Sequence, residues 1–149
     1  MMDDVQIIKN LIYAYAEYLD LGDLDAVAKL FTKAEIYAPA TDSTIKGKEN
    51  ILKMYKESCR IYKETGTPCT KHITTNIILD IDLENGSADS RSYYTVVQST
   101  PEFDLQTIIA GRYHDSFFKS NGKWQFKKRV MIVDLMGDCS SHLLIDQNF

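Results

Sequence analysis

Apolar residues in the first part of the chain recur at helical spacing. Between residues 4 and 19 they return every three or four positions, and Gly22 follows as a natural stop. Asp23 is then the expected N-cap of a second, short helix, whose apolar stripe runs from Leu24 to Phe31. A third helix is predicted from about residue 48 to residue 63. Two short strands, residues 34–39 and 43–46, are expected to pair in the segment between the second and third helices.

After Pro68 the pattern changes from helical spacing to an alternation of apolar and polar residues. Four long strands are predicted, over residues 69–83, 87–99, 105–119 and 123–135. Residues 85–86 and 121–122 are both Asn-Gly, a strong signal for a two-residue hairpin turn, and residues 101–104 form a looser middle turn. Successive hairpins predict an antiparallel meander.

Helices that come first and an antiparallel sheet that comes last define an α+β fold. A strongly twisted sheet of this length curls, and the helices must cover one of its faces. The interior is then either filled or left as a pocket, and periodicity does not distinguish the two. The 149 residues fit one domain with one core, spanning positions 1–149.

Composition and charge narrow the class of protein. The chain has 44% hydrophobic and 26% charged residues, as in an ordinary globular protein, and its net charge of −4 argues against a nucleic-acid partner. No apolar run approaches the length of a membrane span, and the acidic start lacks the features of a signal peptide. We therefore expect a cytoplasmic protein with no membrane partner. The three cysteines are widely spaced and are expected to be unpaired.

The motifs that bind common cofactors are absent from the sequence. No G-x-G-x-x-G follows a predicted strand, and there is neither an H-E-x-x-H motif nor a G-x-S-x-G elbow. The three histidines, His72, His114 and His142, are scattered along the chain. We expect a site without a cofactor and without a metal.

Three residues stand out as candidates for chemistry. Tyr15 lies on the apolar stripe of the first helix, Asp20 ends that helix beside two leucines, and His72 lies near the start of the first long strand. Each has a structural alternative: Tyr15 as core, Asp20 as a capping or turn residue, and His72 as a surface residue. Alternation places His72 on the more polar face of its strand, together with Asn76 and Ile78. This face would lie either toward solvent or toward a hydrated pocket.

Several segments resemble the SnoaL-like proteins of the nuclear transport factor 2-like superfamily. Residues 15–31, with an Asp before a Gly-Asp turn and a helix that ends Leu-Phe, are similar to the opening of those domains. Residues 72–76 are similar to their His-x-x-x-Asn strand, and residues 111–113, 121–124, 128–134 and 137–138 to their last strands and tail. The resemblance covers nearly the whole chain. It implies a cystatin-like α+β fold in which a cone-shaped, curved antiparallel sheet wraps around the N-terminal helices.

The resemblance also implies site residues. The dehydratase-like branch of this superfamily, which includes scytalone dehydratase and bile acid 7α-dehydratase, uses an Asp–His pair, and Asp20 and His72 match it. Tyr15 matches the tyrosine of the bile acid enzyme. A second group, with pocket-facing or structural roles left open, fits the family pattern: Asn76, Arg112, Tyr113 and Arg129.

On this basis the sequence predicts a lyase or isomerase of dehydratase type that acts on a hydrophobic, cyclic small molecule. His72 would be the general base, Asp20 would orient it, and Tyr15 would donate a hydrogen bond. Two alternatives stay open, a non-catalytic binding protein or accessory subunit and an enzyme like the polyketide cyclases. An open sheet with too few helices to cover both faces predicts a homodimer or homotrimer.

Overall fold

The computed structural model describes residues 3–145. Its helices are α1 (Asp4–Asp20), α2 (Leu24–Leu30) and α3 (Gly47–Ser58), with a 3₁₀ turn, η1, at Pro39–Thr41. Asp23 caps α2 as predicted, because its side chain accepts a hydrogen bond from the Ala26 backbone N–H at 3.0 Å.

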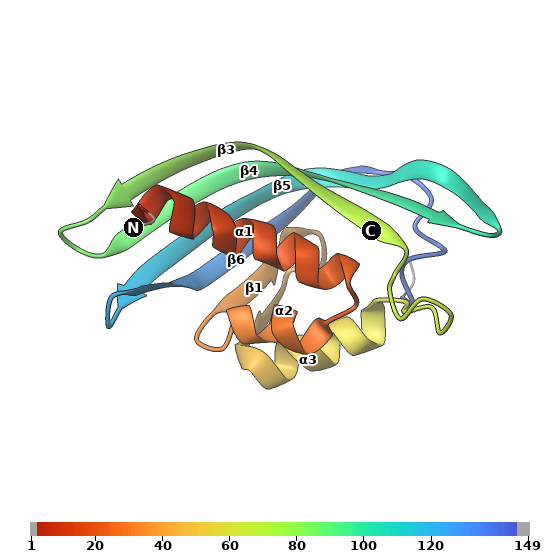
Figure 1. Ribbon diagram of the computed structural model, residues 1–149, viewed down its shortest axis with the longest axis horizontal. Helices are drawn as coiled ribbons and strands as arrows, with labels where there is room; N and C mark the ends of the chain where they lie inside the picture. The colour runs from red at the N-terminus through yellow and green to blue at the C-terminus, as the bar shows by residue number, and fades with distance from the viewer. Residues whose placement is uncertain (1–2, 146–149) are drawn as a thin grey trace.

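Six strands form one curved sheet in the order β2-β1-β6-β5-β4-β3. Their bounds are β1 (Glu35–Ala38), β2 (Ser43–Lys46), β3 (Thr70–Asp82), β4 (Ser87–Thr100), β5 (Phe103–Ser120) and β6 (Lys123–Met136). The four long strands form the predicted antiparallel meander. The sheet is nevertheless mixed, because β1 runs parallel to β6. Figure 1 shows the long strands arching over α1, with α2 and α3 below.

The third helix is shorter than the sequence predicts. It ends at Ser58 and not near residue 63, because Cys59 turns to an extended conformation and forms a β-bridge with Leu143 of the C-terminal segment. Tyr62 forms a second bridge, with Thr67. Contacts with a segment distant in the sequence therefore end the helix, and local periodicity carries no signal for them.

The concave face of the sheet and the inner faces of the helices share one core. Its largest fully buried apolar side chains come from every layer: Ile8, Ile12, Val27, Phe31, Ile51, Val96, Ile108, Phe117 and Phe126. Burial of a side chain of this size contributes about 1.5–3 kcal/mol to the free energy of folding. The apolar stripes of the three helices thus all contribute to this one core.

A β-bulge in β3 reverses the faces of that strand. Asn76 has a positive φ of 55°, and the register with β4 shifts between Thr75 and Ile78. Before the bulge His72 points inward and Ile73 outward, whereas after it Ile78 points outward. The sequence expectation that His72 shares a face with Ile78 is therefore wrong, since it assumed an unbroken alternation.

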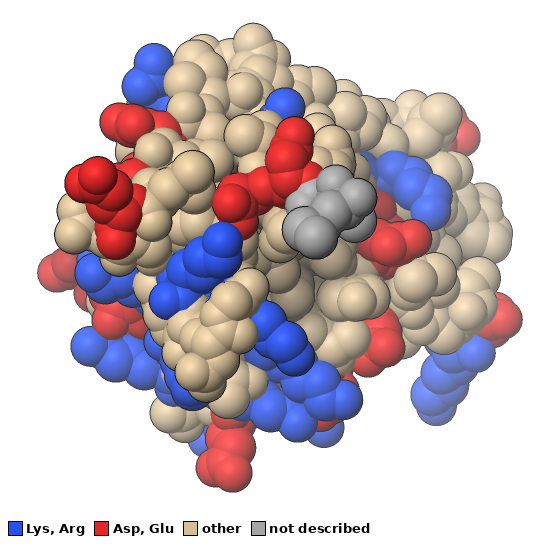
Figure 2. Space-filling model, turned by 60° about the vertical axis from the view of Figure 1, so that its left-hand side comes forward, with Lys and Arg blue, Asp and Glu red and all other residues tan. Residues whose placement is uncertain are grey.

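The convex face of the sheet is not covered by a helix (Figure 1). Ile73, Ile78 and Tyr93 are each about half exposed on it, at 46%, 52% and 53%. Acidic and basic side chains are interspersed on the face that Figure 2 presents.

No helix of the described chain is both long and apolar enough to cross a membrane. The three cysteines are unpaired, and Cys59 and Cys139 are buried.

Candidate active site

A cavity of about 270 Å³ lies between the concave face of the sheet, the helices α1 and α3, and the segment after β6. Its wall is mostly apolar, and its residues include Leu19, Met54, Val96, Met131 and Leu143. Two histidines and four tyrosines supply much of the polar part of the wall. Ligand pockets for small molecules commonly combine apolar walls with a few placed polar groups, and this one lies near the small end of their size range.

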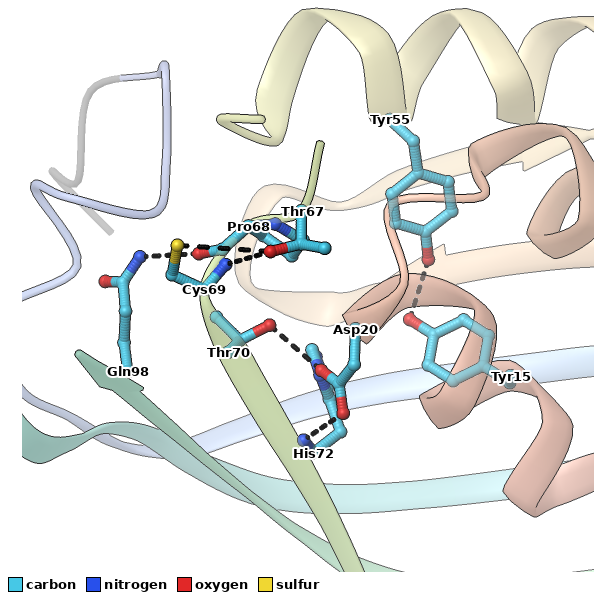
Figure 3. Close-up of polar contacts among 9 residues, drawn as sticks. All are labelled: Tyr15, Asp20, Tyr55, Thr67, Pro68, Cys69, Thr70, His72 and Gln98. Carbon is cyan, nitrogen blue, oxygen red and sulfur yellow. Dashed lines mark hydrogen bonds and ion pairs between the residues drawn. The ribbon is translucent and has the colours of Figure 1, made fainter. Parts of the chain in front are cut away.

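Asp20 and His72 meet at one side of this cavity. Asp20 is the last residue of α1, and His72 is the third residue of β3. Asp20 Oδ1 lies 2.6 Å from His72 Nδ1, and Asp20 Oδ2 accepts a hydrogen bond from the His72 backbone N–H at 2.8 Å. Thr70 donates a third hydrogen bond to the same carboxylate at 2.9 Å. Figure 3 shows the carboxylate of Asp20 directed at the strand that carries both partners.

The surroundings of Asp20 favour its ionised form. Burial alone would raise the pKa of the Asp20 carboxyl, but the hydrogen bonds from His72 and Thr70 outweigh burial, and the pKa is lowered. An ionised carboxylate only accepts hydrogen bonds, so His72 Nδ1 carries the proton between them. Nε2 is then the imidazole nitrogen left for a ligand. His72 belongs to the cavity wall, and its side chain is only 7% exposed.

Tyr15 lines the same cavity from α1. Its hydroxyl lies 2.7 Å from the hydroxyl of Tyr55 on α3, and the two face each other in Figure 3. Burial raises the pKa of Tyr15, although the nearby charge of Arg129 acts in the opposite direction. Burial also raises the pKa of Tyr55 well above its usual value. Both side chains therefore remain neutral phenols that can donate a hydrogen bond.

Tyr113 and Arg129 occupy different parts of the interior. The ring of Tyr113 belongs to the cavity wall and stacks on Tyr94 at 4.3 Å between ring centroids. Arg129 is fully buried and makes a bidentate ion pair with Asp115, with both N–O distances at 2.8 Å. Its guanidinium lies 4.2 Å from the ring centroid of Tyr15 and 3.9 Å from that of Tyr113. Arg129 thus supports the tyrosines and is not part of the cavity wall.

Asn76 and Arg112 lie away from the cavity. Asn76 is exposed at the bulge of β3. Arg112 points to the convex face, where it pairs with Asp134 through two hydrogen bonds of 2.8 Å. Neither residue belongs to the wall of this cavity. The structure therefore brings Asp20, His72 and Tyr15 to one cavity, whereas Asn76 and Arg112 lie outside it.

Sequence reasoning did not single out three polar residues of the interior. Tyr55 follows the helical spacing of apolar residues that is typical of core positions, although it also lines the cavity. Asp115 pairs with Arg129 only because the register of their strands shifts. His142 lies 70 positions after His72 in the chain, yet their ring centroids are 6.4 Å apart. Within residues 3–145 no group of three or more His, Cys, Asp or Glu side chains is arranged to hold a metal ion.

Comparisons with known proteins agree with this architecture. A family model described as a SnoaL-like domain matches residues 1–130. A protein of unknown function with a cystatin-like fold from Nostoc punctiforme superposes with a TM-score of 0.71 at 23% identity, over 88% of this chain and 91% of that one. A proposed scytalone dehydratase from Novosphingobium aromaticivorans gives 0.70 at 26% identity, over 91% and 87%. ActVI-ORFA from Streptomyces coelicolor gives 0.70 at 14% identity, over 87% and 96%. No curated protein sequence matches the chain.

Proposed function

Because the chain belongs to the SnoaL-like domain family, we propose that it is a dehydratase-like lyase or isomerase that needs no cofactor and acts on a hydrophobic, cyclic small molecule. The observation that carries the proposal is the 2.6 Å contact between Asp20 and His72 on the wall of an apolar cavity. The similarity to a proposed scytalone dehydratase supports the same reaction class.

In this proposal His72 is the general base. Its Nε2 takes a proton from a carbon beside a carbonyl group of the substrate, and the C–H electrons form a carbon–carbon double bond. The hydroxyl on the next carbon leaves as water by taking up that proton from the imidazolium, which restores neutral His72. Asp20 holds the proton of Nδ1 and so fixes the tautomer, and its charge stabilises the imidazolium that forms. General base catalysis of this kind contributes about 10²–10⁴-fold to the rate.

Tyr15 supplies the hydrogen-bond donor of the proposed site. Its raised pKa keeps the phenol protonated, and its hydroxyl already bonds that of Tyr55. If Tyr55 donates to Tyr15, the Tyr15 proton is free to bond an oxygen of the substrate on which charge develops. Tyr113 provides a flat wall against which a ring can lie.

A second candidate is a binding protein that retains the cavity without the chemistry. The predominantly apolar wall favours this candidate, because it would hold a hydrophobic ligand whether or not His72 acts as a base. The two candidates differ in what they require of Asp20, since only catalysis depends on its charge.

The test uses 3-hydroxy-1-tetralone, a bicyclic β-hydroxy ketone whose loss of water gives 1-naphthol. We expect the wild-type protein to form 1-naphthol, measured by its fluorescence. Asp20→Asn and His72→Ala should each lower kcat by about 10²–10⁴-fold. The double variant should be little slower than either, because the pair acts as one unit.

Arg112→Met, on the convex face, is the matched control and should retain the wild-type rate. Equal turnover in wild type and Asp20→Asn would contradict the assignment of Asp20. Absence of turnover in the wild type, together with binding of 1-naphthol, would favour the binding protein.

A further inference from the structure

The segment after β6 returns to the cavity and is held there by hydrogen bonds to its backbone. The Arg60 backbone N–H donates to the carbonyl of His142 at 2.8 Å. One position earlier, the Ser141 carbonyl accepts from the Tyr62 hydroxyl at 2.6 Å and from the Gln98 side-chain amide at 3.0 Å. The backbone that carries His142 is therefore fixed by two separate parts of the protein, and its side chain forms part of the cavity wall.

Most other polar groups of the wall already have partners within the protein. The hydroxyls of Tyr15 and Tyr55 bond each other. Those of Tyr94 and Ser58 donate to backbone carbonyls at 3.1 and 2.8 Å. A hydroxyl that donates to a carbonyl can still accept a hydrogen bond but no longer has a proton to donate, and the Tyr15–Tyr55 pair has one proton left between its two hydroxyls. The two imidazoles, His72 through Nε2 and His142, are wall groups whose ring nitrogens can each still donate or accept a hydrogen bond.

The ring of His142 makes no hydrogen bond to residues 3–145. Nδ1 is shielded and unpartnered, which leaves Nε2 as the nitrogen that a ligand can reach. The ring faces that of His72, with centroids 6.4 Å apart and planes inclined at 66°. A ligand atom in contact with one imidazole therefore lies close to the other.

The environment of His142 keeps its imidazole neutral. Burial lowers the pKa of His142 to about 4, and a positive charge on His72 acts in the same direction, whereas Asp20 opposes both. A neutral imidazole carries one N–H donor and one acceptor nitrogen. It can therefore donate to a carbonyl oxygen or accept from a hydroxyl group without bringing a charge into the apolar wall.

We propose that His142 is a ligand-binding residue whose Nε2 hydrogen-bonds a hydroxyl or carbonyl oxygen of a cyclic ligand, and so selects oxygenated rings over plain hydrocarbons. The inference rests on the proposed function only for the kind of ligand, and it does not require His72 to act as a base. An oxygen bound to His142 places the neighbouring carbon atoms beside His72.

The test compares 1-naphthol with 1-methylnaphthalene, which has a methyl group in place of the hydroxyl. Affinities are measured from chemical-shift changes in NMR titrations at neutral pH. We expect the wild-type protein to prefer 1-naphthol by about tenfold, the factor that one hydrogen bond of ordinary net strength provides. His142→Phe keeps a ring without a hydrogen-bonding nitrogen, and should bring the two affinities to within about twofold. His142→Gln, which retains a polar group, should restore most of the preference.

Asp20→Asn is the control that separates this inference from the proposed chemistry. It should lose turnover and yet retain the preference for 1-naphthol. An unchanged preference in His142→Phe would overturn the inference, because the oxygen would then bind elsewhere. Failure of the wild type to bind either compound, or equal affinity for both, would overturn it as well. A parallel loss of both affinities in both variants would assign His142 a structural role only.

Discussion

At the scale of single residues, the site depends on how each polar group is satisfied. Asp20 accepts three hydrogen bonds from two residues of one strand, which a carboxylate can do because both of its oxygens are acceptors. The sequence could suggest Asp20 and His72 only through family resemblance, because an Asp at a helix end is as readily a cap. It could not suggest Asp115 or His142, since their partners are defined by the tertiary structure.

The lowered pKa of Asp20 predicts a pH-dependent contribution to stability. The contribution is present above the pKa of the unfolded carboxyl, about 3.9, and is lost as the pH falls through the lower pKa of the folded state. Urea unfolding of wild type and Asp20→Asn at several pH values checks this. The wild type should lose more stability than the variant on acidification, and parallel curves for the two proteins would contradict the prediction.

The buried ion pair predicts an unequal effect of two arginine substitutions. Arg129→Met leaves the fully buried Asp115 carboxylate without a partner and should lower the free energy of unfolding by about 3–5 kcal/mol. Arg112→Met breaks a similar bidentate pair that is exposed, and should cost about 0–1 kcal/mol. Urea denaturation measures both.

The double variant Arg129→Met/Asp115→Leu removes both buried charges and should recover much of the loss. Equal costs for the two single arginine variants would show that burial does not govern the strength of the pairs.

At the scale of elements, the bulges decide which residues reach the interior. The hairpin of β5 and β6 begins in simple register, and then shifts between Ser116 and Phe117. Continued without this shift, the register would place Arg129 opposite His114 on the convex face, and not opposite Asp115. Strand limits and hairpin turns follow from alternation and from Asn-Gly pairs, whereas a bulge adds one residue with no comparable local signal.

The bulge in β3 makes a prediction for its central residue. Asn76 holds a left-handed φ of 55°, which costs little for Asn but about 1–2 kcal/mol for a β-branched side chain. Asn76→Val should therefore destabilise the protein by about that amount, whereas Asn76→Gly should be tolerated. Thermal unfolding measures the effect. Thr75→Val, at the exposed neighbour, is the control and should cost little, so an equal loss in Thr75→Val would contradict the argument.

At the scale of the whole molecule, the helices cover the concave face of the sheet and leave the convex face uncovered. The concave face contributes the core and the cavity, while the convex face exposes Ile73, Ile78 and Tyr93 on neighbouring strands. Exposed apolar side chains that cluster on one face mark a site of association. The α+β class and the concave cover of helices were predictable from periodicity, but the parallel pairing of β1 with β6 was not, because it joins segments far apart in the sequence.

We accordingly predict that the protein is a homodimer or homotrimer at micromolar concentration. Tyr93→Glu places a charge on the convex face and should shift the protein to monomers, as measured by light scattering. Tyr13→Glu, on an exposed position of α1, is the matched control and should leave the assembly intact. A monomeric wild type, or dissociation by both variants, would contradict the assignment of this face.

The cavity is lined by two parts of the chain that are held in place in different ways: α1 with β3, and the segment after β6. Asp20 and His72 belong to α1 and β3, which pack against each other. His142 lies beyond residue 130, where the family match ends, on a segment held largely through its backbone atoms. Hydrogen bonds to backbone atoms do not depend on which side chains the segment carries, so the sequence of such a segment varies readily. If His142 selects the ligand as proposed, substitutions in the segment after β6 change ligand preference while the Asp20–His72 contact stays as it is.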